Sequence, residues 1–165
     1  MRTIVAALLF VGFGCRLGAQ EFDRLKVGVQ PDGRVVVPTN QVLKPAGTQV
    51  EFPGRPVDLA FAEEGKLIVA KNMRNLVLLE TATGKVRQTL PIAGEKLGVV
   101  GLIVVDGKIH VSDAQGHLHT AERGDNGNYK LTKPIALEKP KVGGLADLSG
   151  VAKLSEDELL VACSR

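Results

Sequence analysis

Residues 63–72, EEGKLIVAKN, contain the pattern from which we predict the fold. Charged turn residues and a glycine come first, and a short apolar run that ends on Lys-Asn follows them. A similar arrangement returns as VDGKIHVSDA at 105–114 and as SEDELLVACS at 155–164. A structural unit that returns every 40–50 residues or so indicates a repeat protein.

Short apolar runs bounded by turn residues continue on both sides of this stretch. In RPVDLAF, Val57, Leu59 and Phe61 alternate with Asp58 and Ala60, which is the pattern of a half-buried strand. No segment after residue 20 combines helical periodicity with helical length. We therefore expect strands in each of these runs: RPVDLAF, LIVAK, LVLLE, VRQTLPI, VVGLIVV, KIHVSD, HLHTAE, YKLTKPIAL, GVAKL and ELLVACSR.

Four strands per repeat of this length are typical of β-propeller blades. A four-stranded sheet has two faces to bury, and it buries them against neighbouring sheets. The fold class we predict is all-β, with about two and a half four-stranded blades, as in a fragment of a larger propeller. The expected units are 53–97, 98–149 and 150–165, and they follow an irregular arm at 21–52.

The first unit resembles the YVTN-family β-propeller repeat. In that repeat an apolar alternation leads to Ser-Pro-Asp-Gly, a strand ending Val-Ala-Asn, and a turn D-x-x-T-G-K-V. The corresponding residues here are Ala62-Glu63-Glu64-Gly65, Val69-Ala70-Lys71-Asn72 with one residue inserted, and Glu80-Thr81-Ala82-Thr83-Gly84-Lys85-Val86. The resemblance covers 53–165 and is best over 53–92, because the second unit has lost the Thr-Gly turn.

The resemblance implies a secreted bacterial protein. Some propellers of this kind are fused to an alkaline-phosphatase-like phosphoesterase domain, but nothing in these 165 residues resembles that enzyme.

The first twenty residues have the layout of a secretory signal peptide. Arg2 precedes an apolar run that ends at Phe13, and small residues lead to an expected cleavage site near Ala19 or Gln20. A competing interpretation is lipid attachment at Cys15, although the residues before it match a lipobox poorly. We expect a secreted or periplasmic protein, with no transmembrane segment in the mature chain.

Composition narrows the class of partner. Aromatic residues make up 4% of the chain and Trp is absent, which disfavours aromatic platforms for sugars or bases. The net charge of +3 falls toward neutrality without the leader, which carries Arg2 and Arg16 and no acid. Nucleic acid is therefore not an expected partner. We interpret Cys163, within LLVAC, as a buried small apolar residue.

Six residues are candidates for a site. His117 and His119 point the same way from one strand, and with Asp113 they could bind a divalent metal, although we favour their interpretation as polar positions on a solvent-facing sheet surface. Asp58 lies in the strand expected to be innermost, where it could contact a ligand or hydrogen-bond a neighbouring blade. The turn after LIVAK supplies three further candidates, interpreted as rim ligands or solvated turn residues: Lys71, Asn72 and Arg74.

The sequence carries no P-loop, nucleophile elbow, dinucleotide fingerprint or zinc-protease motif. The leading hypothesis is a non-catalytic binding scaffold with no cofactor, whose loops bind a protein, a polymer or a small molecule. Two alternatives stay open. One is the front of a larger secreted hydrolase, of phosphoesterase type, and the other is a small self-associating β module.

Overall fold

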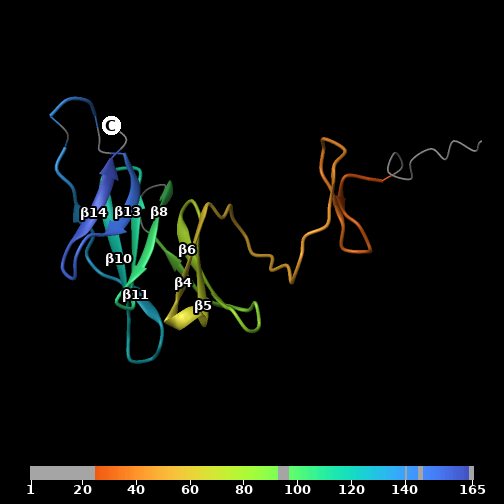
Figure 1. Cartoon of the computed structure of the whole chain (residues 1–165), viewed down its shortest axis with the longest axis horizontal. Coiled ribbons are helices and arrows are strands. Elements are labelled where there is room, and N and C mark those ends of the chain that lie inside the picture. Colours follow the sequence, from red (N-terminus) through yellow and green to blue (C-terminus); the bar gives the residue numbers. More distant parts are fainter. Residues whose placement is uncertain (1–24, 93–96, 140, 145–146, 164–165) are drawn as a thin grey trace, which may run out of the picture. The chain divides into compact units, whose positions relative to one another are not determined.

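The computed structural model describes residues 25–92, 97–139, 141–144 and 147–163. Across these residues the chain is all-β, as expected, and its strands form several antiparallel sheets (Figure 1). The chain divides into two compact units, Met1–Gly47 and Thr48–Arg165. The predicted signal peptide at 1–20 and its competing lipid site at Cys15 lie outside the described residues.

The first unit contains a small sheet of three two-residue strands, β1 (Gly28–Val29), β2 (Val35–Val36) and β3 (Val42–Leu43). The Pro-Asp-Gly sequence forms the turn between β1 and β2, and Gly33 there has a φ of 80°. This sheet occupies much of the segment that we expected to be an irregular arm.

The second unit begins with a four-stranded meander, which we call the first sheet. Its strands are β4 (Asp58–Ala62), β5 (Leu67–Lys71), β6 (Asn75–Glu80) and β7 (Val86–Pro91), each paired with the next. A single 3₁₀ turn, η2 (Glu63–Gly65), joins β4 to β5. All four strands fall where apolar runs between turn residues predicted them.

The second sheet repeats this order with β8 (Leu97–Val105), β9 (Lys108–Asp113), β10 (His117–Arg123) and β11 (Tyr129–Leu131). Asp106 and Gly107 both have positive φ, which is the two-residue hairpin turn expected of Asp-Gly. The predicted strand YKLTKPIAL is interrupted, because β12 (Ile135–Ala136) pairs separately with β10. Pro134 precedes that second piece, and proline cannot donate a ladder hydrogen bond.

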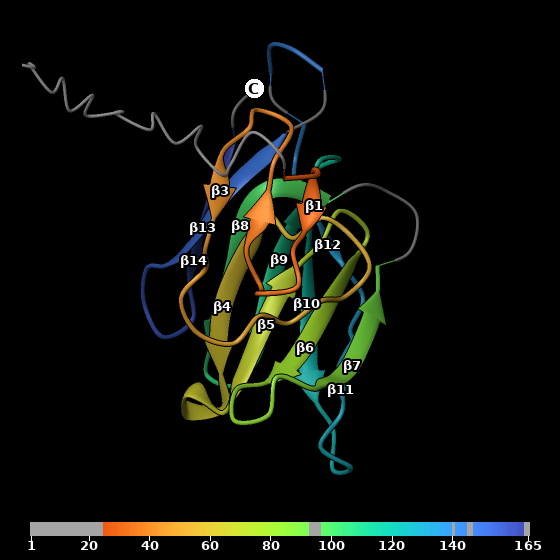
Figure 2. The ribbon, with the colours of Figure 1, turned by 90° about the vertical axis from the view of Figure 1, so that its right-hand side faces the viewer.

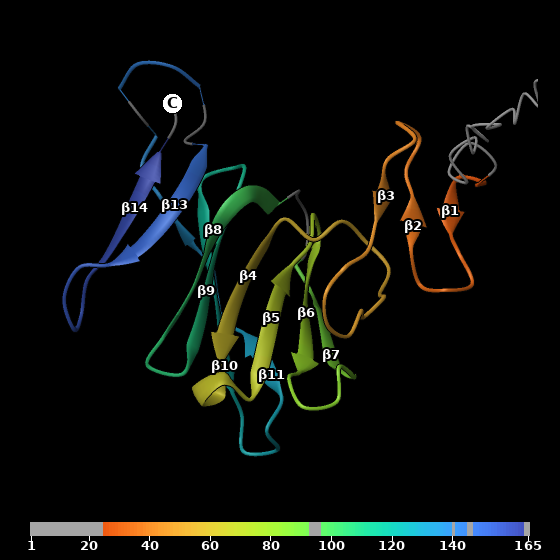
Figure 3. The same ribbon diagram turned by 45° about the vertical axis from the view of Figure 1, so that its right-hand side comes forward.

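The third sheet is the hairpin of β13 (Leu148–Lys153) and β14 (Leu159–Cys163). The three sheets form an open stack within the second unit: β4 lies against β8, β7 against β11, and β13 against β8 and β9 (Figures 2 and 3). Among the described residues this stack does not close into a ring.

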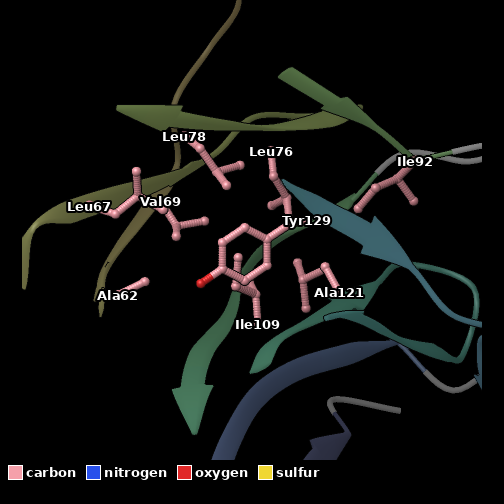
Figure 4. Close-up of a cluster of buried hydrophobic side chains, with 10 residues drawn as sticks. Ala62, Leu67, Val69, Leu76, Leu78, Ile92, Ile109, Ala121 and Tyr129 are labelled. Carbon is pink, nitrogen blue, oxygen red and sulfur yellow. The ribbon is translucent and has the colours of Figure 1, made fainter. Parts of the chain in front are cut away.

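The main core fills the space between the first and second sheets. Its members are aliphatic except for one tyrosine, as the low aromatic content requires. Figure 4 shows side chains of both sheets meeting around Tyr129. The buried residues of this core are Ala62, Leu67, Val69, Leu76, Leu78, Ile92, Ile109, Val111, Ala121 and Tyr129.

The core corrects the residue correspondence between the first and second sheets that the sequence suggested. Aligning the glycines of the two turns matches Leu67 with Ile109, yet both side chains enter the same layer between the sheets. The turns differ in length. Ala62 pairs with Leu67 across four residues, whereas Val105 pairs with Lys108 across two. A shift of one residue turns a side chain to the other face of its sheet, so the equivalent of Leu67 in the second sheet is Lys108.

Apolar residues remain exposed at both ends of the stack. On the first sheet, Leu59 and Phe61 are 64% and 67% exposed, and on the third, Leu160 is 58% exposed. Cys163 is exposed as well, so its interpretation as a buried residue was wrong. The apolar run around it lies on a two-stranded sheet, which buries less than a four-stranded one.

Candidate binding site

Asp58 links the first two sheets. Its Oδ2 accepts a hydrogen bond of 3.2 Å from the backbone N–H of Leu102 on β8, and its Oδ1 accepts one of 2.9 Å from Leu59. The alternative in which Asp58 bonds a neighbouring sheet is thereby confirmed. Its role as a ligand contact has no further support in the geometry.

Lys71 is fully buried, so its interpretation as a solvated turn residue was wrong. It is the last residue of β5, and its ammonium group donates to the backbone oxygens of Val100 (2.5 Å) and Ser112 (3.1 Å). Burial lowers the pKa of Lys71 to about 8, against the opposing effect of the negative charges of Asp58 and Asp113. A lysine so placed ties the two sheets together through backbone acceptors.

An irregularity in β8 makes this arrangement possible. The pairing of β8 with β9 shifts register between Leu97 and Leu102. The backbone oxygen of Val100 lies within that irregular stretch, where it accepts hydrogen bonds from Lys71 and from the hydroxyl of Ser112 at 3.1 Å. The bulge therefore presents an acceptor to the neighbouring sheet, which is a recognised use of bulges.

Asn72 is also buried, contrary to the solvated interpretation, whereas Arg74 is exposed as that interpretation expected. The amide nitrogen of Asn72 donates to Pro53 (3.3 Å) and to the side-chain oxygen of Asn75 (2.8 Å). Its Oδ1 is buried and has no hydrogen-bond partner among the described residues. These contacts hold the segment before β4 against the turn after β5.

His117 and His119 converge on one carboxylate oxygen. Asp113 Oδ2 lies 3.0 Å from His117 Nδ1 and 3.0 Å from His119 Nε2, and the backbone N–H groups of Gln115 and His117 donate to Oδ1 at 2.8 Å each. Burial alone would raise the pKa of Asp113, but these hydrogen bonds together hold it below its ordinary value. The expected proximity of the three side chains is present.

Both imidazoles use a ring nitrogen on the carboxylate. Within the described ranges, no group of three or more His, Cys, Asp or Glu side chains is arranged to hold a metal ion. Metal binding at His117 and His119 stays a hypothesis, and the geometry accounts for the cluster as a hydrogen-bonded network inside the second sheet.

The structure also contains a cleft between the first two sheets that we did not predict. We call it the turn cleft, because residues of the turns after β4 and β8 belong to its lining. Its volume is about 800 Å³. Its lining is mostly charged and consists of Glu63, Glu64, Lys66, Asp106, Gly107, Lys108, Glu122, Arg123 and Tyr129.

Glu63 connects the two sheets beside the turn cleft. Its carboxylate accepts hydrogen bonds from Arg87 Nη1 at 3.0 and 3.2 Å, and Arg123 Nε lies 3.0 Å from Oε1. Arg87 also donates to the backbone oxygen of Gly127. Glu63 can adopt this position because η2 places it in the left-handed region, with a φ of 50°.

Tyr129 places a buried hydroxyl group near the carboxylate of Glu63. The residue is 1% exposed, and its hydroxyl has no hydrogen-bond partner among the described residues. Figure 4 shows this hydroxyl on the side of Ala62, the residue that precedes the cleft-forming turn. Burial raises the pKa of Tyr129, and the negative charge of Glu63 raises it further. As the only tyrosine of the chain it was a signal that sequence reasoning passed over.

Comparison of the sequence with models of protein families and with curated proteins gives no match. In the part of the chain that is described, no helix has the length and apolar character needed to cross a membrane.

Proposed function

We propose that the chain is a secreted or periplasmic segment of β-propeller type that acts as a non-catalytic binding scaffold. The observation that carries the proposal is the turn cleft. Turns from two successive repeats meet at one end of the stacked sheets and enclose a polar volume. Loops held by a rigid scaffold are the usual place for binding residues.

The stacking of the sheets supports the propeller assignment. Two meanders of the same strand order lie with first strand against first strand and last against last, and the third hairpin continues the series. Neighbouring blades of a propeller stack in this way. The exposed Leu59 and Phe61 fit the assignment, because they belong to a sheet face that a further blade would cover.

The charges around the cleft support a binding function. Glu63 is engaged by Arg87 and Arg123, and the ammonium of Lys108 lies 2.6 Å from the carboxylate of Glu122. These ion pairs hold charges of both signs in fixed positions in the lining of the cleft. The cleft therefore offers fixed charges and hydrogen-bonding groups to a ligand.

A ligand screen by nuclear magnetic resonance tests the proposal. The ¹⁵N-labelled protein is titrated with amino acids, dipeptides, oligosaccharides and small metabolites. We expect at least one compound to shift the backbone signals of 63–66 and 106–108 saturably and to be recovered unchanged. Conversion of the bound compound into a product, or no effect on those signals from any compound, contradicts the proposal.

Self-association is a second candidate function, favoured by the exposed apolar end of the first sheet. Leu59 and Phe61 alternate on β4 and expose the edge of an apolar face, although the same face is buried farther in, at Ala70, Val77 and Leu79. Exposed apolar sheet faces and edges promote pairing between chains. Light scattering over a range of protein concentrations measures this association directly.

A further inference from the structure

We propose that the turn cleft binds a small zwitterionic ligand, of the class of free amino acids and short peptides with free termini. This inference rests on the binding function proposed above and names the ligand class of the same site. It is carried by two independent features, the unpaired charges of the cleft and the buried hydroxyl of Tyr129.

The charges of the cleft are mixed and nearly balanced, with four acidic and three basic side chains in its lining. Most of them are neutralised within the protein. Glu63 pairs with Arg123, Lys108 with Glu122, and Asp106 with Lys153 from the third sheet.

Two opposite charges of the lining are left over. Glu64 and Lys66 form no ion pair with any residue of the described chain, and both belong to the turn after β4. A ligand with a single charge satisfies one of them and is repelled by the other. A ligand with an ammonium and a carboxylate satisfies both, because opposite charges at close range attract.

Tyr129 adds a neutral hydrogen-bonding group. A buried hydroxyl without a partner is unfavourable, so proteins rarely leave one unless a ligand or water uses it. Tyr129 belongs to the lining of the cleft, and its hydroxyl lies on the side of Ala62, the residue before the turn that carries Glu64 and Lys66. A ligand carboxylate placed against Lys66 can accept a hydrogen bond from this hydroxyl, while the ligand ammonium lies against Glu64.

The test is a titration of the ¹⁵N-labelled protein with the free amino acids and a mixed set of dipeptides. Each ligand found is then compared with its N-acetylated form, which has no ammonium, and its C-terminal amide, which has no carboxylate. We expect saturable shifts at 63–66 and at Tyr129, and binding at least about tenfold weaker for either blocked form.

Variants of the lining residues show which side chains contact the ligand. Glu64→Gln and Lys66→Met are each expected to weaken binding about tenfold, and Tyr129→Phe by a similar factor, since each removes one polar contact. Tyr129→Phe is expected to leave the unfolding midpoint unchanged or to raise it, because the hydroxyl has no hydrogen-bond partner among the described residues. Glu156→Gln and Lys133→Met, at exposed positions outside the lining, serve as matched controls.

The outcomes separate this inference from the function on which it rests. If blocked forms bind as tightly as free ones, or if only a sugar or other non-zwitterion shifts the cleft signals, the zwitterion is wrong and the binding scaffold stands. If no compound of any class shifts them, both are wrong. If Tyr129→Phe binds the ligand as tightly as the unaltered protein, the hydroxyl is not part of the site.

Discussion

Lys71 Nζ lies 3.1 Å from the backbone oxygen of Ser112, so a lysine of the first sheet donates into the backbone of the second. The lysine is fully buried, and its charge has Asp58 and Asp113 nearby. Desolvation of a charge in that position destabilises the folded state, whereas its interactions with the carboxylates and the carbonyl acceptors stabilise it. The balance makes the stability of the protein depend on pH.

Stability is expected to rise with pH from about 8 to about 9.5. Burial lowers the pKa of Lys71 to about 8, below the value of about 10.4 of an unfolded lysine. In this window the unfolded state binds more protons than the folded state, so the free energy of unfolding rises with pH. Urea denaturation at pH 7.5, 8.5 and 9.5 measures the rise, which cannot exceed about 3 kcal/mol.

Two variants isolate the contribution of Lys71. Lys71→Met is expected to remove the rise, whereas Lys85→Met, at an exposed position, is expected to keep it. Measurements stop below pH 10 because Tyr129, whose pKa is raised, acts in the opposite direction there. An equal rise in Lys71→Met and in the unaltered protein would contradict a buried titrating lysine.

Asp58→Ala is expected to lower the free energy of unfolding by about 1–3 kcal/mol, because it leaves the N–H of Leu102 without an acceptor between the sheets. Asp58→Asn keeps a side-chain oxygen, so its loss is expected to be smaller. Chemical denaturation of both variants measures the difference. If Asp58→Ala leaves the free energy of unfolding unchanged, the 3.2 Å contact contributes nothing to the packing of β4 against β8.

Asp113 is expected to stabilise the protein above about pH 4 and to stop doing so in acid. Its pKa is held below the ordinary value, so its contribution is full above the unfolded pKa of about 3.9 and is lost as the pH falls through the folded pKa. In Asp113→Asn the free energy of unfolding is expected to fall less steeply as the pH drops below about 4. Acid unfolding followed by circular dichroism compares it with Asp125→Asn, a change at an exposed loop position.

The strands were predictable because each signal is local. Alternation around Leu59 and the Asp106-Gly107 turn act over a few residues, and the structure follows them. The residue correspondence between the first and second sheets was not predictable in detail. The matching glycines belong to a four-residue turn in the first sheet and a two-residue turn in the second, and that difference reverses which side chains face the core.

The candidate site was predictable only where its members are neighbours in the sequence. Asp113, His117 and His119 were expected together and are together. Lys71 was misjudged because its burial depends on Val100 and Ser112, which lie on other strands and whose acceptor oxygens belong to the backbone. A lysine near a turn is usually solvated, and only tertiary packing changes that.

The turn cleft depends on contacts that are more distant still. Glu63 meets Arg123, and Tyr129 reaches the layer beneath Ala62, only because the second sheet stacks on the first. No local sequence pattern predicts that the two sheets stack. The single tyrosine of an aromatic-poor chain was the one feature of the sequence that pointed to this place.

The two ion pairs of Glu63 are expected to differ in strength. Glu63 and Arg87 have side chains only 18% and 22% exposed, whereas that of Arg123 is 52% exposed. Double-mutant cycles with alanine are expected to give a coupling energy of about 1–2 kcal/mol for Glu63 with Arg87. The coupling of Glu63 with Arg123 is expected to stay below about 1 kcal/mol, because solvent screens it. Equal couplings would contradict this account of burial.

Phe61→Ser is expected to reduce self-association while leaving the fold intact. Phe61 is 67% exposed on a sheet face that also carries Leu59, so the change removes apolar surface from the exterior. The free energy of unfolding is expected to change by less than about 1 kcal/mol. Size-exclusion chromatography with light scattering measures the molecular mass over a range of concentrations. Val142→Ser, which removes an even more exposed apolar residue from a loop, is the control and is expected to leave association unchanged. If both variants associate like the unaltered protein, the face that carries Phe61 is not where copies of the chain meet.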